Sequence, residues 1–172
     1  NPFLLTANAD TRSGIGTIKS RIGLKKSAQT FSQSVDLLNK VKEANSKKSI
    51  SCVFVDEAQF LTEQQVWQLA KVVDDLEIPV LCFGLRVDFQ GNLFPGSKCL
   101  LSIADELKEV KTICHCGKKA TMVIRQLNGK TVIDGDQVQI GGNESYTSLC
   151  RKHWLEEFEK EWSKWLDCKH SL

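Results

Sequence analysis

The sequence predicts an α/β fold, in which a parallel sheet flanked by helices is followed by a small β lobe and a C-terminal helix. Three observations predict it. Short apolar runs alternate with amphipathic stretches over residues 1–113, which is typical of a parallel sheet covered on both faces. Hairpin-type strands occupy 114–153, and Cys and His pairs stand at both ends of that segment. An amphipathic stretch then fills 154–172, and the length of 172 residues suits one main domain with a small appendage.

The N-terminal segment predicts a strand, a loop and a helix. Phe3–Ala7 has the composition of a buried strand and ends in the polar turn Asn8–Arg12. Residues 13–27 carry Gly, Lys and Arg without apolar periodicity, so we expect a mobile loop there. A helix that ends near Lys47 follows, because four apolar residues recur at helical spacing: Phe31, Val35, Leu38 and Val41.

Further elements of the sheet follow in strand–helix order. Ile50–Val55 and Pro79–Phe83 are compact apolar runs and are predicted to be strands. Thr62 and Gln65 form a capping box, which starts a helix between these two strands. Residues 100–107 predict a short helix, and 110–113 predict the last strand of the core sheet.

The lobe is predicted from turn chemistry. Thr121–Leu127 and Lys130–Ile133 flank Asn128-Gly129, the strongest short hairpin signal. Gln137–Ile140 is predicted to be a third strand. A final helix from about residue 152 presents one broad aromatic face, which we expect to pack on the rest of the protein: Trp154, Phe158, Trp162 and Trp165.

Two split ligand pairs predict a structural zinc site. The first is the C-x-C pair Cys114 and Cys116. After 33 intervening residues comes the second pair, Cys150 and His153, at C-x-x-H spacing. Zinc prefers tetrahedral ligation by sulfur and nitrogen, and three Cys with one His is a common structural set. Gly117 fits the tight turn that aims both sulfurs of the first pair at one ion. A lobe this small would take much of its folding free energy from the metal.

Composition narrows the class of protein. The net charge of +2 is too small to indicate a nucleic-acid or membrane partner. No apolar run approaches the roughly 20 residues that span a bilayer, and no signal peptide is visible. Seven cysteines, three of them assigned to the metal together with His153, fit a reducing compartment better than a disulfide framework. We therefore expect a cytoplasmic protein.

The run Ser51–Glu57 has the form of a Walker B strand, in which apolar residues end in two carboxylates. Magnesium takes hard oxygen ligands, and Asp56 is suited to hold it through water. Glu57 would then orient the nucleophile that attacks a γ-phosphate. Acidic residues also occur at strand ends for solubility alone, so the wider context decides.

That context consists of three further strings in addition to the zinc pairs. They are Val55–Leu61 (VDEAQFL), Phe83–Gly91 (FGLRVDFQG) and Ile140–Tyr146 (IGGNESY). Together they closely resemble the type II thymidine kinase family over about residues 3–153. The resemblance implies a RecA-like ATP-binding domain over 1–113, a zinc-clipped nucleoside-binding lobe over 114–153, and transfer of the ATP γ-phosphate to the 5′-hydroxyl of thymidine.

The resemblance also implies roles for residues near the phosphates. Asp56 matches the carboxylate associated with Mg²⁺, and Glu57 matches the general base that engages the 5′-hydroxyl. Asp10 and Arg12 match a D-x-R element that works near the phosphates and Mg²⁺ of ATP.

For the nucleoside, the resemblance implies two groups of residues. Apolar side chains enclose it: Phe60, Leu85, Phe89 and Phe94. In the lobe, backbone groups near Val123 and at Ile140, Gly141 and Gly142 read the thymine edge, and Tyr146 helps to shape the pocket. Family members are commonly tetramers that thymidine triphosphate inhibits, and the resemblance implies both properties here.

The sequence departs from the family in its phosphate loop. No Gly-x-x-x-x-Gly-Lys-[Ser/Thr] string occurs, and Gly14-Ile15-Gly16 lacks the lysine. In the family this loop precedes the segment that begins here at Phe3. We therefore expect that the chain represents part of a longer protein and is inactive without that segment.

Two other functions fit part of the sequence. Asp56-Glu57-Ala58-Gln59 also resembles the DEAx box of RecA-like, nucleic-acid-dependent ATPases and helicases, but the chain has no second such domain and no broad basic character. A non-enzymatic, zinc-stabilised binding module would explain the Cys and His pairs, but not the carboxylates after the 50–55 strand.

Overall fold

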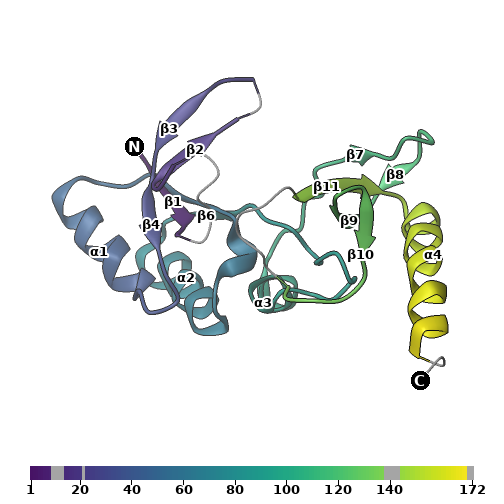
Figure 1. Cartoon of the computed structure of the whole chain (residues 1–172). Coiled ribbons are helices and arrows are strands. Elements are labelled where there is room, and N and C mark those ends of the chain that lie inside the picture. The colour runs from purple at the N-terminus through teal and green to yellow at the C-terminus, as the bar shows by residue number, and fades with distance from the viewer. Residues whose placement is uncertain (9–13, 21, 138–143, 170–172) are drawn as a thin grey trace. The chain divides into compact units, whose positions relative to one another are not determined.

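The computed structural model describes residues 1–8, 14–20, 22–137 and 144–169. The chain divides into two compact units, each described here by itself. The first, the α/β unit, comprises Asn1–Arg86 and Phe94–Asp105. The second, the lobe, comprises Val87–Leu93 and Glu106–Leu172. Both appear in Figure 1.

A four-stranded parallel sheet forms the centre of the α/β unit, as the sequence predicts. Its order is β4 (Gln29–Phe31), β1 (Pro2–Ala7), β5 (Cys52–Asp56) and β6 (Val80–Cys82). The chain runs from β1 to β4 on one side and then crosses to β5 on the other. The switch point of the sheet therefore lies between β1 and β5. Ligands of open α/β sheets bind at the carboxyl ends of the strands beside such a point.

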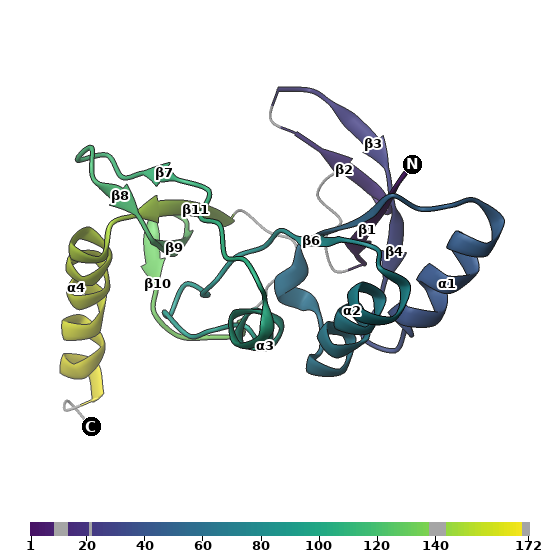
Figure 2. The same cartoon turned by 180° about the vertical axis from the view of Figure 1, so that it is seen from behind.

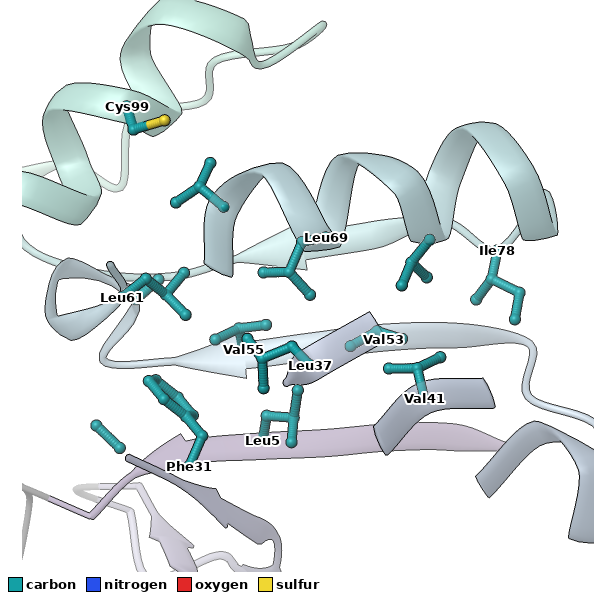
Figure 3. Packing of buried hydrophobic residues seen from close by; sticks show 14 of the residues in the cluster. Leu5, Phe31, Leu37, Val41, Val53, Val55, Leu61, Leu69, Ile78 and Cys99 are labelled. Carbon is teal, nitrogen blue, oxygen red and sulfur yellow. The ribbon is translucent and has the colours of Figure 1, made fainter. Parts of the chain in front are cut away.

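Helices α1 (Leu37–Lys47) and α2 (Glu63–Leu76) contribute to one apolar core with the sheet. Val53 and Val55 of β5 are fully buried against it, as Figure 3 shows, whereas Phe54 between them is half-buried. The predicted cover on both faces is therefore complete only on the face that these helices contact. Thr62 caps α2 through the predicted capping box with Gln65. Helix α3 (Pro95–Ile103) joins the same core through Cys99.

Three predictions for the α/β unit are corrected. Residues 13–27 are not simply a loop, because β2 (Thr17–Lys19) and β3 (Lys25–Ser27) pair as an antiparallel hairpin that extends from the sheet in both views (Figures 1 and 2). The hairpin is largely exposed, so its sequence carries no apolar alternation. Phe31 ends β4 and is not helical, because α1 begins only after its cap Asp36. Helix α3 also begins and ends earlier than the predicted 100–107.

The lobe contains a three-stranded antiparallel sheet in the order β10 (Lys130–Val132), β9 (Met122–Leu127) and β11 (Glu144–Leu149). The predicted hairpin is confirmed, since Asn128 and Gly129 connect β9 to β10 with φ values of 51° and 76°. Positive φ at both turn residues is the conformation for which Asn-Gly is selected. Helix α4 (Arg151–Lys169) follows β11, as predicted.

One further strand prediction is wrong, and another falls mostly on residues that are not described. Residues 110–113 do not add a strand to the core sheet. Instead β7 (Thr112–Ile113) pairs with β8 (Lys119–Ala120) in a small exposed hairpin. Most of the predicted strand Gln137–Ile140 lies outside the described residues. The sequence interpretation also missed β11, the strand that carries Tyr146.

None of the described helices combines the length and the apolar character of a membrane span.

Candidate active site and metal centre

The two predicted carboxylates lie at the carboxyl end of β5, beside the switch point. Asp56 is the last residue of β5 and pairs in register with Thr6 of β1. Glu57 follows in a left-handed conformation, with φ 54° and ψ 40°. Its backbone N–H donates to Asp56 Oδ1 at 3.0 Å. A non-glycine residue rarely adopts this conformation, and such strain concentrates at functional sites. The turn aims the chain out of the sheet directly after the carboxylates.

A hydrogen-bonded framework holds this turn against the end of β6. Ala58 N–H donates to the Phe83 carbonyl at 2.8 Å, and Phe83 N–H donates to the Val55 carbonyl at 2.8 Å. Gln59, which the sequence interpretation did not single out, is 2% exposed and donates through Nε2 to Glu57 Oε2 at 2.6 Å. Its own Oε1 accepts from the backbone N–H of Leu85 at 3.1 Å.

Three of the apolar residues assigned to the nucleoside lie in the α/β unit. Phe60 ends the short 3-10 helix η1 (Ala58–Phe60), and its ring meets the Phe94 ring edge-on with centroids 6.1 Å apart. Phe94 is 5% exposed and precedes α3. Leu85 is 52% exposed, which leaves much of its side chain open to solvent.

In the lobe, the predicted metal ligands come together. The ligand atoms of Cys114, Cys116, Cys150 and His153 all lie within 4.8 Å of one another. His153 Nδ1 lies 3.3 Å from Cys114 Sγ and 3.5 Å from Cys150 Sγ, and Cys116 Sγ lies 3.9 Å from Cys150 Sγ. Zn–S bonds of about 2.3 Å at tetrahedral angles place two sulfurs roughly 3.8 Å apart. The donor set and its spacing therefore fit zinc.

Local structure explains how the two pairs meet. Cys114 and Cys116 lie in the β7–β8 turn, where Gly117 has φ 80° and donates its N–H to the Cys114 carbonyl at 2.8 Å. Cys150 directly precedes α4, and His153 lies in the first turn of that helix. With Nδ1 directed at the sulfurs, His153 has Nε2 3.8 Å from a carboxylate oxygen of Glu156. A carboxylate behind a ligating imidazole orients the ring.

The thiols of the cluster differ in their readiness to ionise. Burial opposes ionisation of Cys114, but the backbone amides of Cys116 and Cys150 and the side chains of His153 and Cys116 lower its pKa to about 6. The pKa of Cys116 is raised, because burial and the neighbouring thiols outweigh the backbone amide of Lys118.

Two cysteines of the α/β unit have raised pKa values. Burial raises the pKa of Cys82 to about 12. Burial, with a contribution from the charge of Glu63, also raises the pKa of Cys99. Both remain protonated thiols near neutral pH, so neither is activated as a nucleophile.

The remaining described residues assigned to the nucleoside lie in the lobe. Phe89 is 2% exposed, and the guanidinium carbon of buried Arg125 lies 4.0 Å from its ring centroid. The Trp154 indole N–H donates to the carbonyls of Phe89 and Val123 at 3.0 and 3.1 Å. Tyr146 is 53% exposed on β11. The sequence interpretation missed Arg125, for which a strand composition gives no signal of burial.

Five predicted site residues lie outside the described residues: Asp10, Arg12, Ile140, Gly141 and Gly142.

Paired carboxylates at the switch point of a parallel sheet place this chain in the class of open α/β proteins with a ligand site at the carboxyl ends of the strands. A family model for thymidine kinase matches residues 1–154. The thymidine kinase of Ruegeria pomeroyi is 59% identical over 155 residues, which cover 90% of this chain and 78% of the relative. That of Jannaschia sp. is 57% identical over 155 residues, covering 90% and 80%. That of Agrobacterium fabrum is 54% identical over 157 residues, covering 91% and 81%.

The chain therefore belongs to the thymidine kinase family. Membership confirms the resemblance seen in the sequence and the prediction of a kinase. It also decides against the helicase and the non-enzymatic binding module.

Proposed function

We propose that the protein transfers the γ-phosphate of ATP to the 5′-hydroxyl of thymidine, with Glu57 as the general base and Asp56 as the carboxylate that holds Mg²⁺. The observation that carries this assignment is the placement of both carboxylates at the switch point, with Glu57 in a left-handed turn. Family membership supports the choice of thymidine and ATP as substrates.

The chemistry suits two adjacent carboxylates with different tasks. In a loose phosphoryl-transfer transition state, little proton removal is needed early, so the base mainly orients the alcohol. Glu57 accepts the 5′-hydroxyl proton, and the hydrogen bond from Gln59 to Oε2 fixes one oxygen of the Glu57 carboxylate. Magnesium, when bound with ATP, would neutralise charge that develops on the phosphates.

For the other substrate contacts we carry over the residues that the resemblance assigns. Asp10 and Arg12 are proposed to act near the phosphates. Phe60, Leu85 and Phe94 of the α/β unit are proposed to contact the nucleoside. The lobe residues proposed to contact it are Phe89, Val123, Ile140, Gly141, Gly142 and Tyr146.

In the lobe, Cys114, Cys116, Cys150 and His153 are proposed to hold a structural zinc ion, which the ligand distances support. A cytoplasmic location, a tetrameric assembly and inhibition by thymidine triphosphate are proposed on the resemblance alone.

The experiment is ATP-dependent phosphorylation of thymidine by the full-length protein and its Glu57→Gln variant. We expect turnover to fall by about 10²- to 10⁴-fold, while calorimetry shows nearly unchanged thymidine binding, because the amide keeps the shape but cannot accept a proton. Near-normal turnover would remove Glu57 as the base.

The matched control is Glu77→Gln. Glu77 is an exposed glutamate with φ 53°, almost the backbone conformation of Glu57, but it caps the C-terminus of α2. We expect this variant to keep its turnover. A comparable loss in both variants would indicate a backbone effect of the substitution, and not the loss of a base.

A further inference from the structure

The buried side chain of Gln59 bridges the proposed base and the loop after β6. Its amide nitrogen donates to Glu57 Oε2 at 2.6 Å, and its amide oxygen accepts from Leu85 N–H at 3.1 Å. The two partners fix the orientation of the amide. A flipped amide would set its oxygen against a carboxylate and its nitrogen against an N–H donor.

The same chain of hydrogen bonds continues through Leu85. The Leu85 carbonyl accepts from Ser97 Oγ at 2.6 Å, and Ser97 lies in α3. Both backbone groups of Leu85 are thus held by side chains, one from η1 and one from α3. Gln59 and Ser97 are 2% and 7% exposed, so water competes little for these bonds.

Two glycines, Gly84 and Gly96, pack closely against the η1 turn. A Cβ on Gly84 would lie 2.6 Å from Gln59 Oε1 and 2.9 Å from Gln59 N. A Cβ on Gly96 would lie 2.7 Å from the carbonyl oxygens of Ala58 and Leu61. Only glycine fits at either place without movement of the turn. Gln59 is therefore confined as well as hydrogen-bonded.

We propose that Gln59 is a positioning residue that sets the orientation of the Glu57 carboxylate and, through the same amide, the position of Leu85. This positioning role rests on the proposed function, in which Glu57 is the base and Leu85 contacts the nucleoside. A misplacement of about 1 Å at a reacting group costs on the order of 100-fold in rate. Gln59 would thus act on turnover without touching the substrate.

The test is a double-mutant cycle on the full-length protein, with kcat and the KM for thymidine measured for Gln59→Leu, Glu57→Gln and the double variant. We expect Gln59→Leu to lower kcat about 100-fold when Glu57 is present. In the Glu57→Gln background it should lower the residual kcat less than about 3-fold, because residues that act as a unit are not additive. Equal losses in both backgrounds would overturn the proposal.

Gln65→Leu supplies the matched control. Gln65 is also a buried glutamine, 1% exposed, and its hydrogen bonds join it to Thr62, Ser32 and Val35. Its loss should lower stability and leave kcat of the folded enzyme within about 3-fold. A kcat loss like that of Gln59→Leu would mean that any buried glutamine has this effect, and would also overturn the proposal.

A milder variant serves if Gln59→Leu does not fold. Ser97→Ala removes only the bond to the Leu85 carbonyl, so we expect the KM for thymidine to rise about 5-fold with kcat retained. An unchanged KM would contradict the proposed link to Leu85. A protein that phosphorylates no thymidine, or a Glu57→Gln variant with normal turnover, would overturn the proposed function. Normal turnover of Gln59→Leu beside an inactive Glu57→Gln would overturn the positioning role alone.

Discussion

The α/β unit and the lobe bury different kinds of group. In the part of the chain that the structure describes, the core cluster of the α/β unit contains fifteen buried apolar residues from the sheet, the helices and the connections between them. The corresponding cluster of the lobe contains four, and two of these are the metal-site cysteines Cys114 and Cys150. The lobe also buries Asp88 and Arg125, at 2% exposure each.

This difference indicates which interactions stabilise each unit. Burial of one large aliphatic side chain contributes about 1.5–3 kcal/mol, so the α/β unit can be stabilised by its core alone. Ile124, Leu149 and Phe89 supply less for the lobe. Structural zinc contributes about 10–16 kcal/mol in small metal-dependent domains. The lobe is therefore expected to depend on ligation and polar contacts.

Removal of the metal should have the largest effect. We expect chelation, or Cys150→Ser, to expose the amides of β9 and β11 to hydrogen exchange, because the lobe loses about 10 kcal/mol of ligation free energy. The amides of β5 provide an internal reference in the same sample. Cys52→Ser, a free thiol outside the cluster, is the control and should leave exchange in the lobe unchanged. Retained protection of β9 after metal removal would show that the lobe is stable without ligation.

A cavity in the apolar core should have the next largest effect. Leu69→Ala removes a side chain that is 3% exposed on α2, and we expect the free energy of unfolding of the α/β unit to fall by about 3 kcal/mol. Added zinc should not restore the loss. Urea denaturation measures it, with exposed Lys71→Ala on the same helix as control. A loss below about 1 kcal/mol would mean that this unit does not depend on its apolar core.

The same contrast explains what the sequence could predict. The parallel strands, the α2 capping box and the Asn-Gly hairpin depend on local composition and turn chemistry, and all three are confirmed. The cluster of three cysteines and one histidine could be predicted because metal chemistry restricts the residue types and their spacing. The carboxylates after β5 could be located because a parallel sheet gathers polar residues at its strand ends.

Features that depend on long-range contacts could not be predicted. The β2–β3 hairpin and β11 gave no usable alternation. The exposed run 110–113 was wrongly placed in the core sheet because an apolar run alone does not reveal its partner strand. Gln59 and Arg125 are polar residues whose burial follows only from packing. The hydrogen bond from the Leu85 N–H to the side-chain oxygen of Gln59 spans 26 residues of sequence.

The smallest predicted effect comes from loss of the polar contacts around Asp88 in the lobe. Asp88 Oδ1 accepts from the backbone N–H groups of Gln90 and Asn92 at 3.0 and 2.8 Å, and Oδ2 accepts from Gln137 Nε2 at 2.8 Å. Asp88→Ala leaves these donors unpaired in a buried place. We expect the zinc-loaded lobe to lose about 2 kcal/mol, measured by hydrogen exchange at residues 88–92.

Asp88→Asn separates geometry from charge at the same position. The asparagine oxygen can still accept from both backbone donors, and Gln137 can turn its amide to meet the new NH₂ group. We therefore expect a loss of less than about 1 kcal/mol. A loss as large as that of Asp88→Ala would show that the lobe requires the charge of this carboxylate. Equal stability of both variants and the unchanged protein would mean that the metal alone stabilises the lobe, which would sharpen its contrast with the α/β unit.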